Sequence, residues 1–560
     1  MARAPGSSIP GAYPRHGPPG PDTLAGVFGG RAGDRRRGIA RGVRLGTAVV
    51  ALALAGVGAR ILAGYQWERV TGYATPFAVA LEPGSSTEPL TARVVVVVIE
   101  GLRQDVAATL PTLRALGAQG VSLTARASQP SLALPAWTEL LTGAPPDVSG
   151  VTTDRRTAPA PVDSVLREVT LEGGITAVAG GPGWRTLFGD WVAEGWYGRA
   201  TDAAVGEEAL RLLQEADPSL LVVHLSDVDR AGHAGGVGDG YRAAAQRADA
   251  VVSRMVEVTE GTATLVVTSG HGHVDQGGHG GPEPEVLTTP LILAGPGVRQ
   301  VSQAEVSQAD VAPTVAALLG VPRPVHALGR PLSLLDAGPA ERSEIGQAHR
   351  EVSIRFASRA AEEIGRGASG LATLQSARRE EERSAMLIRL PLAGAFVLIA
   401  GWVLWRTRRG LDQAAVAAGA GVAVAVAALL FVARGLSFSL SEVPDADIGP
   451  FLLTRLIDAV AAGLVGGAVC GWVAGRRGRP RPFAEGLATA AWAMALPALG
   501  SALFFARFGW SFPGRLPDLS AVIAQAVGLV GVFGLGLTAA AVGLAATGVA
   551  SIAYRRAGVE

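Results

Sequence analysis

Long apolar runs alternate with polar stretches along the chain. Near the N-terminus and throughout the last third, these runs are long enough to cross the roughly 30 Å hydrocarbon core of a bilayer. The sequence predicts an all-α transmembrane bundle, with five of its spans following one another in residues 387–556. The six predicted spans cover residues 45–66, 387–405, 414–433, 451–475, 485–506 and 519–549.

The first of these spans, residues 45–66, is the least regular because Arg60 interrupts it. A long Arg side chain near the membrane surface can extend its charged end into water, so a transmembrane anchor tolerates it. A cleaved signal peptide is the alternative interpretation. The Arg-rich leader before the span, without a clear small-residue cleavage site, favours a retained anchor.

Residues 90–335, between the first and second spans, have the pattern of a water-exposed domain. β-branched runs at 219–225 and 264–270 follow segments with helical periodicity at 201–216 and 240–260. Strands that alternate with helices of this length predict a doubly wound α/β fold, with a mostly parallel sheet between two layers of helices.

Two polar segments lie beside these units. Residues 1–44 are rich in Pro, Gly and Arg, which predicts a disordered arm. Residues 336–386 carry charges at helical spacing, which predicts an amphipathic helical linker between the α/β domain and the bundle.

The distribution of Arg predicts the orientation in the membrane. Residues 1–44 contain eight Arg and two Asp, and further Arg clusters occur at 406–409, 476–481 and 555–556. Loops rich in basic residues stay in the cytoplasm, so the N-terminus is expected there and residues 90–335 on the extracytoplasmic side. The net charge of +1 gives no reason to expect a nucleic-acid partner.

Five of the eight histidines lie between His224 and His279. Asp229 and His233 follow one β-branched run, and His271 and His279 follow the next, all on short Gly-rich segments. Open α/β sheets bind ligands at the carboxyl ends of their strands. Zinc accepts imidazole nitrogen and carboxylate oxygen, and three protein ligands leave one position for water or substrate. The alternative is that these are loop histidines whose partners are backbone groups.

The order and spacing of several motifs resemble the alkaline phosphatase superfamily, in particular its type I phosphodiesterase and nucleotide pyrophosphatase branch. The resemblance extends from Arg93 to Leu332. Its motifs are VVVVVIEGLRQD (94–105), QPSLALPAWTELLTGAPPDVSGV (129–151), DVDRAGHAGG (227–236), TSGHGHVDQGGHGG (268–281) and ADVAPTVAALLGVP (309–322).

The resemblance implies two metal sites. One is formed by Asp229, His233 and His279, and all three residue types are present. The second would use an Asp after the first strand and an Asp-His pair, where this chain has Glu100 and Gly270 followed by His271. We therefore expect one zinc ion, with Glu100 and His271 as the remnant of a second site. His273 and Asp275 are further candidates for that second site.

The resemblance also implies a Thr or Ser nucleophile at the position of Ala133. Alanine has no hydroxyl group. The closest hydroxyl is that of Ser131, and in a strand it would be displaced from residue 133 by two rises of about 3.3 Å each. Ser131 is therefore the candidate nucleophile in the absence of the expected one.

We expect a metal-dependent phosphodiesterase or phosphotransferase of weak activity that acts on a phosphorylated envelope lipid or polymer. The alternative is a catalytically silent family member that binds a metal and a phosphorylated ligand. An anchor, an outer phosphatase-like domain and a multi-span bundle resemble the layout of the ethanolamine-phosphate transferases that act on glycosylphosphatidylinositol lipids. Within the bundle, Arg455 and Asp458 lie one helical turn apart, as a headgroup contact or a structural ion pair.

Overall fold

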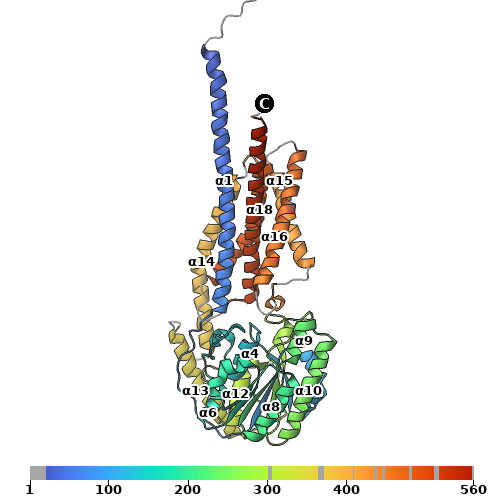
Figure 1. Cartoon of the computed structure of the whole chain (residues 1–560). Coiled ribbons are helices and arrows are strands. Elements are labelled where there is room, and N and C mark those ends of the chain that lie inside the picture. Colours follow the sequence, from blue (N-terminus) through green and yellow to red (C-terminus); the bar gives the residue numbers. More distant parts are fainter. Residues whose placement is uncertain are drawn as a thin grey trace, which may run out of the picture.

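The computed structural model of the 560-residue chain consists of a sheet domain and a helical bundle that lie end to end (Figure 1). The start of the long helix α1 and the C-terminal end both lie at the end of the bundle away from the sheet (Figure 1). The structure describes residues 21–300, 306–363, 371–407, 409–433, 438–443, 448–477, 482–509 and 516–557.

An eight-stranded sheet with the order β4-β3-β5-β1-β6-β7-β2-β8 forms the centre of the domain. Neighbouring strands are parallel except at β7, which is antiparallel to both β6 and β2. The predicted mostly parallel sheet is therefore confirmed. The strands are β1 (Val94–Ile99), β2 (Val121–Arg126), β3 (Thr176–Gly180), β4 (Glu194–Tyr197), β5 (Leu220–Leu225), β6 (Thr264–Thr268), β7 (Thr288–Ala294) and β8 (Val306–Ser307).

Helices cover both faces of the sheet, which confirms the doubly wound fold. The six apolar residues of β1 alternate between the two helical layers, so every one of them is buried. One layer contains α2 (Gln104–Ala107), α3 (Pro111–Gln119), α8 (Asp202–Glu215), α9 (Asp227–Gly235) and α10 (Asp239–Thr259). The other contains α4 (Ala133–Thr142), α6 (Val165–Leu171), α7 (Pro182–Phe188) and α12 (Val311–Leu319). The short elements α5 (Pro146–Ser149), η1 (Gly189–Trp191), α11 (Pro284–Leu287) and η2 (Gln308–Asp310) complete the domain.

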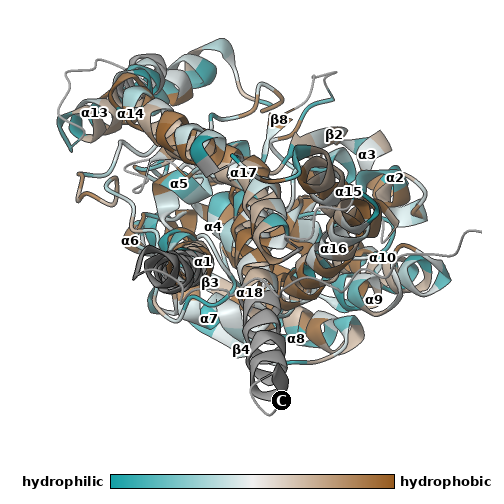
Figure 2. Cartoon of the chain, turned by 90° about the horizontal axis from the view of Figure 1, so that it is seen from above, coloured by the Kyte–Doolittle hydropathy of each residue, from teal (hydrophilic) through white to brown (hydrophobic). Residues whose placement is uncertain are grey.

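Among the described residues, six helices are long and apolar enough to cross a membrane. Many of their large apolar side chains face outward, and Leu398 is 75% exposed, as expected for a surface that contacts lipid. Brown, hydrophobic residues accordingly predominate along α16 and α17 in Figure 2. The helices are α1 (Pro21–Thr71), α14 (Leu371–Thr407), α15 (Gln413–Ala433), α16 (Ile448–Arg476), α17 (Pro482–Phe508) and α18 (Leu519–Ala557), with the short η3 (Leu440–Glu442) between α15 and α16.

Two segments differ in detail from their expected boundaries. Helix α1 begins at Pro21, so residues 21–44 of the expected disordered arm are helical, and residues 1–20 lie outside the described residues. Once the apolar span forms a helix, each further residue adds one hydrogen bond at low cost, which extends the helix into the Arg-rich segment. Within the expected linker, residues 339–363 form α13 (Pro339–Glu363) and residues 371–386 form the first part of α14.

The two parts of the chain share an apolar contact region. Leu132, immediately before α4, belongs to one buried cluster with Leu440 and Val443 of the η3 segment and Phe451 of α16. The start of α4, where the resemblance implies a nucleophile, is therefore covered by the end of the bundle.

Candidate metal centre

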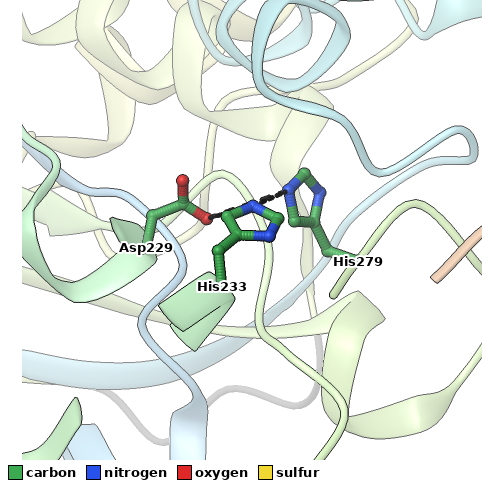
Figure 3. Close-up of side chains that lie close together, drawn as sticks. All are labelled: Asp229, His233 and His279. Carbon is green, nitrogen blue, oxygen red and sulfur yellow. Dashed lines mark hydrogen bonds and ion pairs between the residues drawn. The ribbon is translucent and has the colours of Figure 1, made fainter. Parts of the chain in front are cut away.

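Asp229, His233 and His279 come together as the resemblance implied, and Figure 3 shows their side chains pointing toward one another. Asp229 and His233 lie one turn apart on α9, which begins directly after β5. His279 comes from the Gly-rich loop after β6. The Nε2 atoms of the two histidines are 3.1 Å apart, and Asp229 Oδ1 is 3.6 Å from that of His233 and 3.8 Å from that of His279.

This spacing fits a divalent metal ion. In a tetrahedral zinc site with ligand bonds of about 2.0–2.1 Å, ligand atoms lie about 3.3 Å apart. The three donor atoms have separations close to that value, and their chemistry is the one that zinc prefers.

His279 is held in the form that a metal ligand requires. Its Nδ1 lies 3.0 Å from the carbonyl oxygen of Ser131, which can only accept, so Nδ1 carries the proton and Nε2 keeps its lone pair. Burial, together with the nearby imidazole of His271, holds the pKa of His279 well below its usual range. The ring is therefore neutral at physiological pH.

His273 lies against Asp229, with its Nε2 2.9 Å from Asp229 Oδ1. The backbone N–H of Gly278 donates to His273 Nδ1, so the neutral ring carries its proton on Nε2 and donates it to Asp229. Gly101 and Gly232 pack directly against the Nε2 side of the His273 ring. A Cβ at Gly101 would lie 2.8 Å from Nε2, and one at Gly232 would lie 2.7 Å from it. His273 also lies with Asp229 and His271 in a second group of potential metal ligands among the described residues, so its candidacy for the second site remains a prediction beside its support of Asp229.

Burial alone would raise the pKa of Asp229, but the hydrogen bond from His273 and the nearby imidazoles outweigh it and lower that pKa. The carboxylate is thus ionised, as a ligand must be. Asp275, the other candidate for the second site, forms an ion pair with Arg103, with 2.6 Å between Asp275 Oδ1 and Arg103 Nη1. Asp275 belongs to neither group of potential metal ligands found among the described residues.

Glu100 and His271, the expected remnant of the second site, form a buried pair. Glu100 Oε1 lies 2.9 Å from His271 Nε2, while Oε2 accepts from Trp137 Nε1 at 2.5 Å and lies 3.2 Å from His224 Nε2. Burial would lower the pKa of His271, but Glu100 raises it to about 9. Burial would raise the pKa of Glu100, but His271 and His224 lower it to about 2.

The Glu100–His271 contact is close, although its geometry is not that of a hydrogen bond. His271 Nδ1 lies 3.0 Å from the carbonyl oxygen of Gly272 and donates its proton there. A neutral ring would therefore direct a lone pair at the carboxylate, whereas a protonated ring places a positive charge beside it, as the raised pKa of His271 indicates. His271 also belongs to the group of potential metal ligands that contains Asp229 and His273, whereas Glu100 belongs to neither group found among the described residues.

Ala133 is the first residue of α4 and not part of a strand, and it presents no hydroxyl group there. Ser131 is fully buried, and its hydroxyl accepts from the N–H of Gly280 at 3.1 Å and donates to the carbonyl of Gly281 at 3.3 Å. Both interactions hold the loop that carries His279. This geometry favours a positioning role for Ser131, and its assignment as a nucleophile remains a prediction.

Asp154 is a site residue that sequence analysis did not find. Its carboxylate accepts from the N–H of Leu134 at 2.8 Å, in the first turn of α4. Burial raises the pKa of Asp154 to about 6, so the group is still largely ionised at neutral pH. It lies within electrostatic range of His271, Glu100 and Asp229. A helix N-terminus attracts anions, so Asp154 takes a position that a phosphate group would otherwise favour.

Comparisons with known proteins agree with this assignment of the domain. Residues 193–323 match the model of the Metalloenzyme superfamily, and residues 94–184 match that of the type I phosphodiesterase / nucleotide pyrophosphatase family. The predicted resemblance to this branch of the alkaline phosphatase superfamily is thus confirmed.

Curated relatives extend the resemblance to ethanolamine phosphate transferases. The chain is 28% identical to GPI ethanolamine phosphate transferase 2 of Aspergillus fumigatus over an alignment of 277 residues. The alignment covers 42% of this chain and 36% of that protein. It is 26% identical to the catalytic subunit of the human transferase 2 over 296 residues, 47% of this chain and 30% of that protein. The chain therefore spans about a third of the length of these relatives.

Among solved structures, murine ectonucleotide pyrophosphatase / phosphodiesterase 5 aligns with 44% of this chain and 100% of its own, with a TM-score of 0.39 and 14% identity.

Proposed function

We propose that this chain is a membrane-bound phosphodiesterase or phosphotransferase that uses one zinc ion, held by Asp229, His233 and His279, on the extracytoplasmic side. The observation that carries the proposal is the spacing of their three donor atoms, 3.1, 3.6 and 3.8 Å, at the carboxyl end of a parallel sheet. The kinship with ethanolamine phosphate transferases supports transfer of a phosphoester group.

A phosphorylated envelope lipid or polymer is the proposed substrate. The start of α4 shares a buried cluster with η3 and α16, so the centre lies at the junction of domain and bundle, close to the membrane surface. A substrate anchored in the bilayer can present its phosphate there without leaving the membrane. We further propose that Arg455 and Asp458 of α16, buried and 3.3 Å apart, form a structural ion pair within the bundle.

A metal ion at this centre would polarise a phosphoryl oxygen and lower the pKa of a bound water. The protein's own groups then have distinct tasks. His273 holds the carboxylate of Asp229, and the carbonyl of Ser131 fixes the ring of His279. Because residue 133 has no hydroxyl, no covalent phospho-enzyme forms at that position, and we expect turnover to be weak.

A silent, ligand-binding role is the second candidate, and two observations favour it. Ala133 lacks the nucleophile that the resemblance implies, and Glu100 fills the space beside Gly270 where a further carboxylate ligand would lie. Such a protein would bind one metal ion and a phosphorylated ligand without turnover.

The test measures metal content and phosphodiester hydrolysis on the purified full chain. Wild-type protein is expected to retain about one equivalent of zinc after dialysis and to hydrolyse a chromogenic phosphodiester slowly. His233→Ala and His279→Ala should lose the metal and the thermal stabilisation it provides, about 3 kcal/mol when free metal exceeds its Kd a hundredfold. His349→Ala is the matched control, since this histidine lies on α13 and contacts Arg323.

The outcomes separate the two candidates. Metal binding with slow hydrolysis that is lost in His233→Ala supports the enzyme. Metal and phosphate binding without any turnover supports the silent role. Wild-type protein that holds no metal contradicts both.

A further inference from the structure

The η3 turn of the bundle (residues 438–443) rests on the loop that carries His279, here called the glycine loop (residues 277–281). Ser441 links the two, because its hydroxyl accepts from the N–H of Gly281 at 3.0 Å and donates to Glu283 Oε2 at 2.7 Å. Ser441 is 5% exposed, so these hydrogen bonds are shielded from water. A turn between two membrane helices is thus bonded to the metal-binding segment.

The fit between the two segments requires glycine. A side chain at Gly278 would run into the carbonyl of Ser441, and one at Gly281 would run into the hydroxyl of Ser439. At Gly280, whose φ is +106°, a Cβ would lie 3.0 Å from Leu440. The absence of side chains lets the backbone of the glycine loop lie directly against the η3 turn.

The contact continues to the metal ligand through Ser131. The Ser131 hydroxyl bonds to Gly280 and Gly281, and its carbonyl accepts the Nδ1 proton of His279. The η3 turn, the glycine loop, Ser131 and His279 therefore form one hydrogen-bonded unit. The η3 turn, at one end of this unit, belongs to the bundle. His279, at the other end, belongs to the metal centre.

We propose that the η3 turn positions His279, so that the arrangement of the membrane helices sets the metal affinity of the centre. Ser441 and Glu283 are the positioning residues. The inference rests on the proposed metal site but not on turnover. In the sheet domain alone, the N–H of Gly281 and the carboxylate of Glu283 would lose their partner, and the loop carrying His279 would gain freedom.

The experiment compares Ser441→Ala with wild type in the full chain in detergent. The Kd for zinc is measured by competition with a chelator, and the visible spectrum of the cobalt-substituted protein reports the ligand geometry. We expect Ser441→Ala to weaken zinc binding about tenfold, the lower end of the range for residues that support metal ligands, and to change the cobalt spectrum. Ser384→Ala is the matched control, because that hydroxyl bonds to the Glu380 carbonyl of its own helix.

Variants of Glu283 distinguish positioning from packing. Glu283→Gln keeps an oxygen that accepts from Ser441 and should keep the wild-type affinity and spectrum, whereas Glu283→Ala should behave as Ser441→Ala does. These variants also decide the question if Ser441→Ala does not fold. Unchanged zinc affinity and spectrum in folded Ser441→Ala or Glu283→Ala would overturn the inference, while a wild-type chain that binds no metal would overturn the proposed function itself.

Discussion

The carboxylate of Glu100 lies in the space that a side chain at Gly270 would need, because a Cβ at residue 270 would be 2.5 Å from Glu100 Oε1. The two departures from the family pattern are therefore linked. Glutamate is one methylene longer than the expected aspartate, and glycine is shorter than the other expected aspartate. Residue 270 cannot return to the family's aspartate while the longer Glu100 occupies this space.

Restoring Gly270→Asp alone should therefore destabilise the protein rather than rebuild the second site. Forcing a side chain into this filled space is expected to cost about 1–3 kcal/mol, in addition to the repulsion between two carboxylates. Combining Gly270→Asp with Glu100→Asp removes the clash and should raise the retained zinc from about one to two equivalents. Thermal unfolding and metal analysis of the single and double variants are the measurements. A stable Gly270→Asp protein that already holds two ions would contradict the argument.

The Glu100–His271 pair should make the stability of the metal-free protein depend on pH. The pKa of His271 is raised from its ordinary 6.5 to about 9, so its contribution is fully present below about pH 6.5 and is lost as pH rises through 9. The pKa of Glu100 is lowered to about 2, so its contribution is present above its ordinary 4.5 and is lost as pH falls toward 2.

Thermal unfolding of the chelator-treated full chain between pH 6 and 9.5 measures the alkaline part of this dependence. The melting temperature is expected to fall across that range in wild type and to fall much less in Glu100→Gln, which removes the charge that stabilises the imidazolium. An equal decline in both proteins would assign the effect to other groups.

The parts of the site that sequence could predict are those encoded by local spacing. Asp229 and His233 share a helix face because they are four residues apart, and the β-branched runs place both loops at one edge of the sheet. The prediction of β5 and β6 from β-branched runs, and of α8 and α10 from helical periodicity, rests on the same short-range patterns.

The remaining features depend on contacts between distant segments. Asp154 reaches the start of α4 from an irregular loop with no periodic pattern, and nothing near Ser441 in the sequence indicates its bond to Gly281. The role of His273 could have been anticipated only by knowing that Gly278 donates to its Nδ1. Such relationships arise from tertiary packing, which single-sequence patterns do not encode.

The orientation in the membrane is a further prediction. The start of α1 and the C-terminal end lie on the side of the bundle opposite the sheet domain (Figure 1). In the sequence, Arg clusters occur in residues 1–44 and 555–556, near these two ends. A reporter enzyme that is active only outside the cytoplasm should be active when fused after residue 335 and inactive when fused after residue 478. A green fluorescent reporter that matures only in the cytoplasm should give the reverse pair. The opposite results would overturn the argument from basic residues.

Asp154→Asn should strengthen the binding of phosphate to the zinc-loaded protein. The carboxylate lies at the start of α4 near the metal centre and repels an incoming phosphoryl anion, while the amide oxygen of Asn can still accept from the N–H of Leu134. A charge pair about 4 Å apart in water contributes roughly 1 kcal/mol, so the affinity should rise about fivefold.

Titration calorimetry with inorganic phosphate measures the change, with Asp275→Asn as the control because Asp275 pairs with Arg103. The gain should shrink at high ionic strength, since salt screens exposed charges. Weaker phosphate binding in Asp154→Asn would show instead that the carboxyl group contributes to the ligand site.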